Sequence, residues 1–211
     1  MKSLLAIVLI LGLGGVATWA QTDGFSVLTT EAARRQAILA SPLPVPATEL
    51  QLADGHSTGL RTWLSDDGRV TIVNFIFTRC ATVCLSMGDE FQRLQARILE
   101  RGLQDCVRLL SVSFDPRDTP RWLAAYEKRM NVDPDIWQIV LARNDDERRR
   151  LLDTFGIIVI PAPLGQFEHN AAYHIVTPDG QLTRIIDLEE GDAALHYALA
   201  GAGDAGNGGQ P

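Results

Sequence analysis

The stretch from Val70 to Leu94, VTIVNFIFTRCATVCLSMGDEFQRL, constrains the fold most, because its hydrophobic period changes from that of a strand to that of a helix. Residues 70–77 form a nearly continuous apolar and β-branched run, which is typical of a central strand covered on both faces. Beyond this run, apolar residues recur at steps of three and four: Cys84, Met87, Phe91, Leu94 and Ile98. The pattern predicts a buried strand that runs directly into an amphipathic helix.

Two cysteines, Cys80 and Cys84, lie at this junction with three residues between them. If the helix begins between them, both thiols lie near its N-terminus, where the helix dipole and free backbone N–H groups favour an anion. We therefore expect both thiols to ionise more readily than a free cysteine. Such a pair can close into a disulfide or present two soft sulfur ligands to a metal ion. Packing of both as small hydrophobic residues is disfavoured, because Cys80 lies outside the apolar period and beside Arg79.

The chain around this junction alternates between strand and helix patterns. Four strands are predicted, at residues 49–52, 70–77, 107–114 and 137–141. A helix is predicted after each of the last three strands. Thr119 before Pro120 predicts one helix start. Asn144, with Glu147 three residues later, predicts another, and Gly156 predicts where that helix ends. This alternation predicts an α/β fold, with parallel strands in a central sheet flanked by helices.

Shorter segments complete the predicted fold. Residues 59–64 are interpreted as a strand and turn, and residues 161–168 as a loop. Residues 171–176 and 182–186, separated by the turn sequence TPDG, predict a hairpin whose antiparallel strands make the sheet mixed. An amphipathic segment at residues 193–199 is predicted to pack on the sheet.

The N-terminal 20 residues have the pattern of a secretory signal, in which Lys2 and Ser3 precede an apolar core and Ala20 is the expected last residue. The apolar stretch, about 17 residues long, also lies at the lower limit for a membrane anchor. Either interpretation predicts an exported protein whose folded part faces an oxidising compartment. Residues 21–46 predict a linker with a short helix and alternating prolines, residues 47–200 the folded domain and residues 201–211 a disordered tail.

The charge of the chain narrows the classes of partner. The formal net charge is -7 and no basic stripe is visible, which argues against nucleic acid as the main partner. The densest basic cluster, residues 148–150, directly follows three acidic residues and predicts a solvated helix face. The third cysteine, Cys106, starts a predicted apolar strand and is expected to be a buried, inert thiol.

Four histidines could complement the cysteine pair: His56, His169, His174 and His196. His169 is the strongest candidate, because it lies in a loop that enters the predicted hairpin and can fold back over the end of a central strand. His174 lies five residues on, and an odd separation in an extended strand points two side chains to opposite faces. This argues against a zinc site of two cysteines and these two histidines. His56 and His196 are predicted to be surface or helix-face residues.

A site of Cys80, Cys84 and His169 would supply two thiolates and one imidazole. Soft sulfur donors favour Cu(I), and an imidazole nitrogen keeps the site usable for Cu(II). Metal ligation requires the thiolate form, so the affinity would depend on the reduced state of the pair. Thiol–disulfide chemistry, by contrast, would need both cysteines but not His169.

Three segments, in this order, carry a resemblance to a known family. FTRCATVC follows the central strand, SVSFDPRDTP ends the next strand, and EHNAAYHIVTPDGQL lies near the C-terminus. Together they resemble the Sco/SenC family, copper-binding proteins with a thioredoxin-like fold. The resemblance implies one copper ion bound by Cys80, Cys84 and His169. It also implies delivery of copper to the CuA centre of cytochrome c oxidase, or reduction of its cysteines, by a protein of the bacterial periplasm that is soluble or anchored to the inner membrane.

The cysteine motif departs from the pattern usual in that family, C-P-D-x-C-P. From Cys80 to Leu85 this chain reads CATVCL, without either proline or the acid. Loss of the prolines removes a restraint on the backbone, and loss of the acid removes negative charge beside the ligands. We therefore expect a copper affinity and a redox potential that differ from the family norm. Asp115 and Arg79 are candidates for an influence on the ligands, and the sequence assigns neither a role.

The leading hypothesis is therefore a copper chaperone that passes its metal by ligand exchange to a respiratory complex. The alternative is an exported thiol–disulfide oxidoreductase in which one of Cys80 and Cys84 attacks and the other resolves. The C-x3-C spacing, in place of C-x-x-C, argues against this alternative. A peroxidase is a third hypothesis, which rests on fold analogy alone.

Overall fold

The computed structural model describes residues 2–21, 29–79 and 83–207. The chain divides into two compact units, Met1–Ser41 and Pro42–Pro211. The first unit contains α1 (Lys2–Gln21) and α2 (Thr30–Ala40), and the Thr29 side chain caps α2 by accepting a hydrogen bond from the N–H of Ala32. No helix within these described ranges is both long and apolar enough to cross a membrane.

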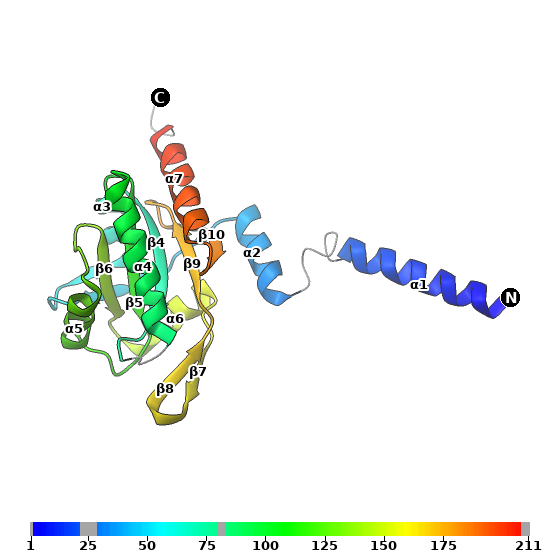
Figure 1. The fold of residues 1–211 in the computed structure, drawn as a ribbon, viewed down its shortest axis with the longest axis horizontal. Helices are drawn as coiled ribbons and strands as arrows, with labels where there is room; N and C mark the ends of the chain where they lie inside the picture. Colours follow the sequence, from blue (N-terminus) through cyan, green and yellow to red (C-terminus); the bar gives the residue numbers. More distant parts are fainter. Residues whose placement is uncertain (1, 22–28, 80–82, 208–211) are drawn as a thin grey trace. The chain divides into compact units, whose positions relative to one another are not determined.

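Within the described residues, the second unit is built on a mixed sheet of eight strands (Figure 1). In spatial order they are β1 (Leu43–Pro44), β10 (Gln181–Asp187), β9 (Ala172–Val176), β4 (Val70–Ile76), β5 (Val107–Ser113), β6 (Trp137–Ala142), β2 (Glu49–Leu52) and β3 (Ser57–Gly59). β4, β5 and β6 are parallel, and the other neighbouring pairs are antiparallel. The mixed sheet and its predicted hairpin, β9–β10, are confirmed.

β4 lies in the interior of the sheet, and all seven of its residues are buried. Its register with β5 runs from Val70 opposite Val107 to Ile76 opposite Ser113, and β9 pairs along its other edge. This agrees with the apolar run that predicts a strand covered on both faces. Because β4, β5 and β6 are parallel, their carboxyl ends meet at one edge of the sheet, where functional residues of α/β folds commonly lie.

The helices described in this unit are α3 (Leu60–Asp67), α4 (Val83–Glu100), α5 (Pro120–Met130), α6 (Asp145–Phe155) and α7 (Gly191–Asn207). The predicted helix signals are confirmed. Pro120 is the first residue of α5, and the Asn144 side chain accepts a hydrogen bond from the N–H of Glu147 at the start of α6. Gly156 ends α6 with a φ of 67°, a left-handed conformation that glycine adopts without steric cost.

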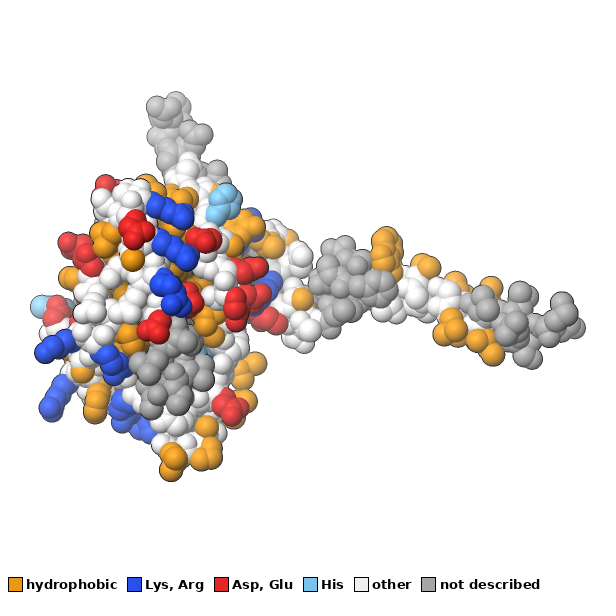
Figure 2. Space-filling model, in the orientation of Figure 1, with side chains coloured by type: hydrophobic (Ala, Val, Ile, Leu, Met, Phe, Trp, Pro, Cys, Tyr) orange, Lys and Arg blue, Asp and Glu red, His pale blue; other side chains and the backbone are white. Residues whose placement is uncertain are grey.

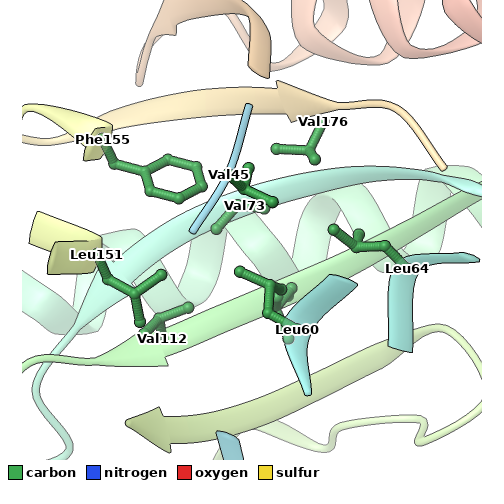
Figure 3. Close-up of a pocket in the computed structure, with 9 residues that line it drawn as sticks. Val45, Leu60, Leu64, Val73, Val112, Leu151, Phe155 and Val176 are labelled. Carbon is green, nitrogen blue, oxygen red and sulfur yellow. The ribbon is translucent and has the colours of Figure 1, made fainter. Parts of the chain in front are cut away.

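Helices cover both faces of the sheet. On one face, α4, α5 and α7 bury apolar residues that include Phe91, Leu123 and Leu195. On the other face, α3 and α6 pack against the sheet through the residues that Figure 3 shows: Val45, Leu60, Leu64, Val73, Val112, Leu151, Phe155 and Val176. These side chains leave no room for a water molecule between them. Each fully buried side chain of this size contributes about 1.5–3 kcal/mol, so both layers stabilise the central strands.

Two short segments differ from the prediction. Residues 60–64, interpreted as strand and turn, belong to α3, because Leu60 and Leu64 lie one helical turn apart and are both buried. Residues 161–168, interpreted as a loop, are mostly strand: β7 (Val159–Ala162) and β8 (Gln166–His169) pair with each other. These two strands form a separate two-stranded sheet, so they lack the apolar run that identifies a strand buried on both faces.

The predicted linker and tail also differ in part. Leu43 and Pro44, within the expected linker, form β1 and pair with β10 at the edge of the main sheet. α7 extends to Asn207, into residues whose composition predicts a disordered tail. Small residues such as alanine still support helical structure when the preceding turns are packed, and Leu195 and Ala198 of α7 are fully buried.

Candidate functional site

The candidate site lies where β4 passes into α4. α4 begins at Val83, so the backbone of Cys84 lies in its first turn, as the sequence predicts. Cys80 lies outside the described residues, and so does the side chain of Cys84. Thr78 and Arg79 are described, and they show where the chain leaves the sheet on its way to Cys80.

His169 is carried by the separate hairpin of β7 and β8. The register pairs Val159 with His169 and Pro161 with Phe167. Because side chains alternate along a strand, Phe167 and His169 lie on one face of the hairpin and Glu168 on the other. Figure 1 shows the hairpin at the same end of the second unit as the start of α4.

Aromatic rings hold the inner face of the hairpin against the ends of β4 and β5. The Phe167 ring centroid lies 5.3 Å from that of Phe77 and 5.7 Å from that of Phe114, edge-on to both. The His169 ring lies 4.7 Å from that of Phe114. Such aromatic pairs contribute about 0.5–1.5 kcal/mol each beyond their burial. Phe77 precedes Cys80 by three residues, so His169 is held at the edge of the sheet from which the cysteine segment starts.

The outer face of the hairpin and its turn expose apolar side chains beside Glu168. Ile158, Ile160 and Leu164 are 66%, 55% and 98% exposed. Figure 2 shows hydrophobic side chains at the lower end of the second unit, where Figure 1 places the hairpin. The contacts that hold the hairpin to the sheet therefore come from its inner face and its turn.

The surroundings of His169 favour a neutral imidazole with one available lone pair. Its Nδ1 lies 2.9 Å from the carbonyl oxygen of Asn170. Because a carbonyl only accepts hydrogen bonds, Nδ1 donates and Nε2 carries the lone pair. Burial lowers the pKa of His169 below its ordinary value, although the bond to Asn170 acts in the opposite direction. A neutral imidazole is the form that binds a metal ion.

Asp118 ties the segment before Cys80 to the end of β5. Its buried carboxylate accepts hydrogen bonds from the backbone N–H of Thr78 at 3.0 Å and from Thr78 Oγ1 at 2.8 Å. It also accepts one from Ser113 Oγ at 2.6 Å. Because Asp118 is buried and bonds to both segments, it fixes the backbone two residues before Cys80 relative to the end of β5.

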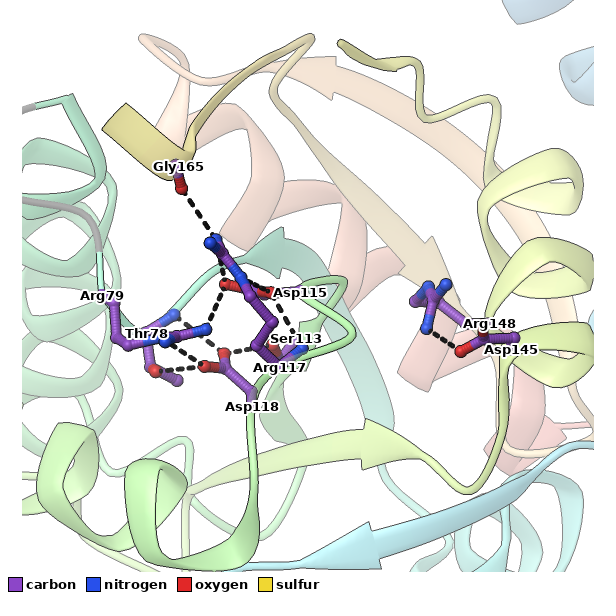
Figure 4. Close-up of polar contacts among 9 residues, drawn as sticks. All are labelled: Thr78, Arg79, Ser113, Asp115, Arg117, Asp118, Asp145, Arg148 and Gly165. Atoms are coloured by element: carbon purple, nitrogen blue, oxygen red, sulfur yellow. Dashed lines mark hydrogen bonds and ion pairs between the residues drawn. The ribbon is translucent and has the colours of Figure 1, made fainter. Parts of the chain in front are cut away.

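Asp115 accepts hydrogen bonds from two arginines (Figure 4). Arg79 Nη2 lies 2.9 Å from its Oδ2, and Arg117 makes a two-pronged contact in which Nε and Nη2 each lie 2.8 Å from a carboxylate oxygen. Burial alone would raise the pKa of Asp115, but the hydrogen bonds and charge of Arg117, together with the charge of Arg79, lower it below its ordinary value. Asp115 is therefore ionised at neutral pH.

Sequence reasoning missed three residues of this region: Phe167, Arg117 and Asp118. A signal was present for each of them. Phe167 lies two residues before His169, the spacing at which strand residues share a face. Arg117 and Asp118 lie in the segment that follows β5 at the carboxyl edge of the sheet.

The other histidines lie away from the candidate site. His174, on β9, is buried, and its Nδ1 and Nε2 lie 3.3 Å and 3.2 Å from the carbonyl oxygens of Val73 and Phe155. Both ring nitrogens thus face the backbone, which agrees with the argument against a zinc site shared by His169 and His174. His56 and His196 are exposed, as predicted.

The prediction of a buried Cys106 is wrong, because its side chain is exposed. Cys106 precedes β5 by one residue. Its N–H donates to the carbonyl of Leu103, and its own carbonyl accepts from the N–H of Val70. The backbone of Cys106 therefore joins the fold while its thiol lies outside the core.

The donor chemistry of the candidate site suits copper. Two thiols and one neutral imidazole match the preference of Cu(I) for sulfur and of Cu(II) for nitrogen. Of the three candidate ligands, His169 alone has a described side chain. Among the side chains that the structure describes, no three histidine, cysteine or acidic residues form a metal-binding group.

The strand order defines the class of fold. Parallel β4 and β5, with the antiparallel hairpin β9–β10 beside β4 and helices on both faces, form a thioredoxin-like fold. A family model described as SCO1/SenC matches residues 51–202. The chain therefore belongs to the SCO1/SenC family, and the predicted resemblance is confirmed.

Individual relatives agree with this assignment. A SCO1 protein homolog from Bacillus subtilis (strain 168) is 29% identical over 137 residues, which are 64% of this chain and 68% of that protein. The structure of BsSco, a member of the Sco family of cytochrome c oxidase assembly proteins, matches with a TM-score of 0.65 and 25% identity over 77% of this chain and 95% of that one.

Two further solved structures are similar. A SCO1/SenC family lipoprotein from Bacillus anthracis str. Ames matches with a TM-score of 0.64 and 25% identity, over 77% of this chain and 99% of that one. ScoI from Arabidopsis thaliana, solved with copper bound, matches with a TM-score of 0.63 and 18% identity, over 78% of this chain and 98% of that one. The likeness to ScoI concerns the fold.

Proposed function

We propose that this protein is a copper chaperone that binds one copper ion through Cys80, Cys84 and His169. The environment of His169 carries the proposal, because it supplies a neutral imidazole with a lone pair at Nε2. Contact of the hairpin with Phe77 and Phe114 brings this imidazole to the edge of the sheet where the cysteine segment begins. The copper-bound ScoI relative supports the choice of metal.

Transfer of the ion proceeds by ligand exchange. Binding replaces the proton of each thiol by the metal, and a cysteine of the acceptor then displaces one ligand of the chaperone at a time, without a change of oxidation state. The acceptor that we propose is the cytochrome c oxidase subunit that carries the CuA site. BsSco, a member of the Sco family of cytochrome c oxidase assembly proteins, supports an acceptor in that complex, and the CuA site is the one that the family resemblance implies.

The proposed location is the bacterial periplasm, with the protein either soluble or anchored to the inner membrane. The signal-like pattern of residues 1–20 supports export. The Bacillus anthracis lipoprotein supports a tether to a membrane. In this compartment the cysteine pair must be kept reduced if it is to bind Cu(I).

The proposal is tested by anaerobic titration of the reduced full chain with Cu(I) in the presence of a competing chelator. Wild type is compared with His169→Ala and with His196→Ala, a matched control that removes an exposed histidine from α7. We expect one tightly bound ion in wild type and in the control. Loss of even an outer partner of a metal ligand costs about 10–100-fold in affinity, so His169→Ala should weaken binding by at least about tenfold.

Thiol–disulfide exchange, measured on the same variants, distinguishes the alternative function. A chaperone should keep its exchange rate with a small thiol in His169→Ala, because that reaction needs only the two cysteines. The chaperone hypothesis would be wrong if wild type bound no copper and if thiol–disulfide exchange were lost in Cys80→Ser or Cys84→Ser. The protein would then be assigned as a thiol–disulfide oxidoreductase.

A further inference from the structure

One carboxylate connects the two halves of the candidate site. Asp115 accepts a hydrogen bond from Arg79, which immediately precedes Cys80, and a two-pronged contact from Arg117 (Figure 4). The backbone N–H of Arg117 also donates to Asp115, at 2.9 Å. Two parallel hydrogen bonds define the plane of a guanidinium as well as its position, so Asp115 sets the orientation of Arg117.

Arg117 extends from this carboxylate to the hairpin that carries His169. Its Nη2 donates to the carbonyl oxygen of Gly165 at 2.7 Å, in the turn between β7 and β8. Its guanidinium also lies over the ring of Phe167, 5.2 Å from the centroid. Arg117 therefore contacts the turn of the hairpin and the residue two positions before His169.

The turn that Arg117 contacts has an unfavourable backbone conformation. Leu164 has a φ of 60°, a left-handed value that is uncommon for a residue with a branched side chain, and Gly165 follows with a φ of 70°. Such conformations persist only where neighbouring groups hold them. A Cβ atom on residue 165 would lie 2.8 Å from Arg117 Nη1, so glycine also permits the close approach of the guanidinium.

The side-chain hydrogen bonds of Asn170 lie at the base of the hairpin. Asn170 accepts a hydrogen bond from the N–H of Ile158 and donates one to the carbonyl of Gly156. These bonds join residues that flank β7 and β8 to each other. The bond between Arg117 and Gly165, by contrast, joins the hairpin to the segment that follows β5. Arg117 therefore restrains the hairpin relative to the end of β5.

We propose that Arg117, oriented by Asp115, is a positioning residue that holds His169 in place relative to the cysteine segment. This inference rests on the proposed copper site, since Arg117 would act on the metal only through His169. The same carboxylate binds the guanidinium of Arg79, so the side chain that precedes Cys80 and the turn of the His169 hairpin are both linked to Asp115. Loss of Arg117 should misplace the imidazole and leave the thiols unaffected.

A double-mutant cycle tests this role. The affinity for Cu(I) is measured for wild type, Arg117→Ala, His169→Ala and the double variant, with Arg121→Ala, an exposed arginine of α5, as the matched control. We expect Arg117→Ala to weaken binding by about tenfold when His169 is present. It should have less than about a twofold effect in the His169→Ala background, because residues that act through one another are not additive. Arg121→Ala should match wild type.

Three further tests separate positioning from general destabilisation. Amide hydrogen exchange of residues 159–169 in the metal-free chain should be faster in Arg117→Ala than in Arg121→Ala, while exchange in β9 is unchanged. The EPR spectrum of the Cu(II) form of Arg117→Ala should shift toward that of His169→Ala. Arg117→Lys should restore the affinity only in part, because an ammonium cannot bridge Asp115 and Gly165 as a planar guanidinium does.

The outcomes distinguish failure of this inference from failure of the proposed function. If wild type binds copper and Arg117→Ala binds it equally well, or if the loss is the same with and without His169, the positioning role is wrong and the copper site stands. Unchanged hairpin exchange in Arg117→Ala would also overturn it. If wild type itself binds no copper, the proposed function fails, and the copper role of Arg117 fails with it.

Discussion

His169 and His174 lie five residues apart in the chain, but His169 is half-buried outside the main sheet and His174 is fully buried within it. His169 ends β8, on a two-stranded hairpin outside the main sheet, and its Nδ1 bonds to a neighbouring carbonyl. His174 lies in β9, where its ring makes edge contacts with Phe75 and Phe155 and both nitrogens approach backbone carbonyls. The two residues have the same chemistry, but only His169 is placed to offer a nitrogen to a ligand.

The comparison shows that the partners of the ring nitrogens decide what a histidine can do. A core histidine satisfies polar groups that would otherwise be buried without a hydrogen bond. A histidine at the edge of a sheet can keep one lone pair available. The hairpin of β7 and β8 is therefore expected to matter for binding, and the hairpin of β9 and β10 for stability.

Truncation of each histidine should give the largest contrast. His174→Ala leaves a cavity and removes the ring N–H that donates to one of two backbone carbonyls, and we expect it to lower the free energy of unfolding by about 3 kcal/mol. His169→Ala removes a partly exposed ring and should cost less than about 1 kcal/mol. Urea unfolding of the metal-free chain measures both. Equal losses for the two variants would contradict the division between a binding hairpin and a stabilising one.

Loosening the hairpin should give an intermediate effect. Phe167→Ala removes the ring that contacts Phe77 and Phe114, and the loss of two such contacts is expected to increase local opening by at least about tenfold. Amide exchange in β7 and β8 should accelerate, while that of β9 stays at the wild-type rate. Leu164→Ala, at the 98% exposed tip, is the control and should change neither. Equal acceleration in both hairpins would show that they open as one unit.

Low pH should loosen the hairpin of β7 and β8, and this effect should be smaller than those of the two preceding substitutions. The pKa of Asp115 lies below its ordinary value of 3.8, so this residue stabilises the fold above pH 3.8 and the stabilisation is lost as the pH falls through the lowered pKa. Arg117→Ala removes the main source of the lowering while burial remains, so the pKa of Asp115 should rise and the loss should begin at higher pH. NMR titration of the Asp115 carboxyl carbon measures this shift. An unchanged pKa would show that Arg117 does not orient on this carboxylate in solution.

Local sequence signals predicted most of the fold. The change of hydrophobic period after Phe77 predicted both β4 and α4, and the proline and asparagine signals predicted the starts of α5 and α6. Both depend on contacts within a few residues of the chain, which the sequence displays directly. The interpretation of residues 161–168 as a loop was wrong, because most of these residues belong to β7 and β8. The rings of Phe77 and Phe114, which stabilise this hairpin, follow β4 and β5 and lie far away in the chain.

The candidate site shows the same division between features set by local sequence and features set by long-range contacts. The sequence by itself determined the types of candidate ligand, the cysteine pair at a strand-to-helix junction and the preference for His169 over His174, because residue type, hydrophobic period and spacing are local properties. Only the tertiary structure decided that Phe167 would seat the hairpin on the sheet and that Arg117 would reach from Asp115 to Gly165. Such contacts join segments about 50 to 90 residues apart, and their energy depends on geometry that no local pattern contains.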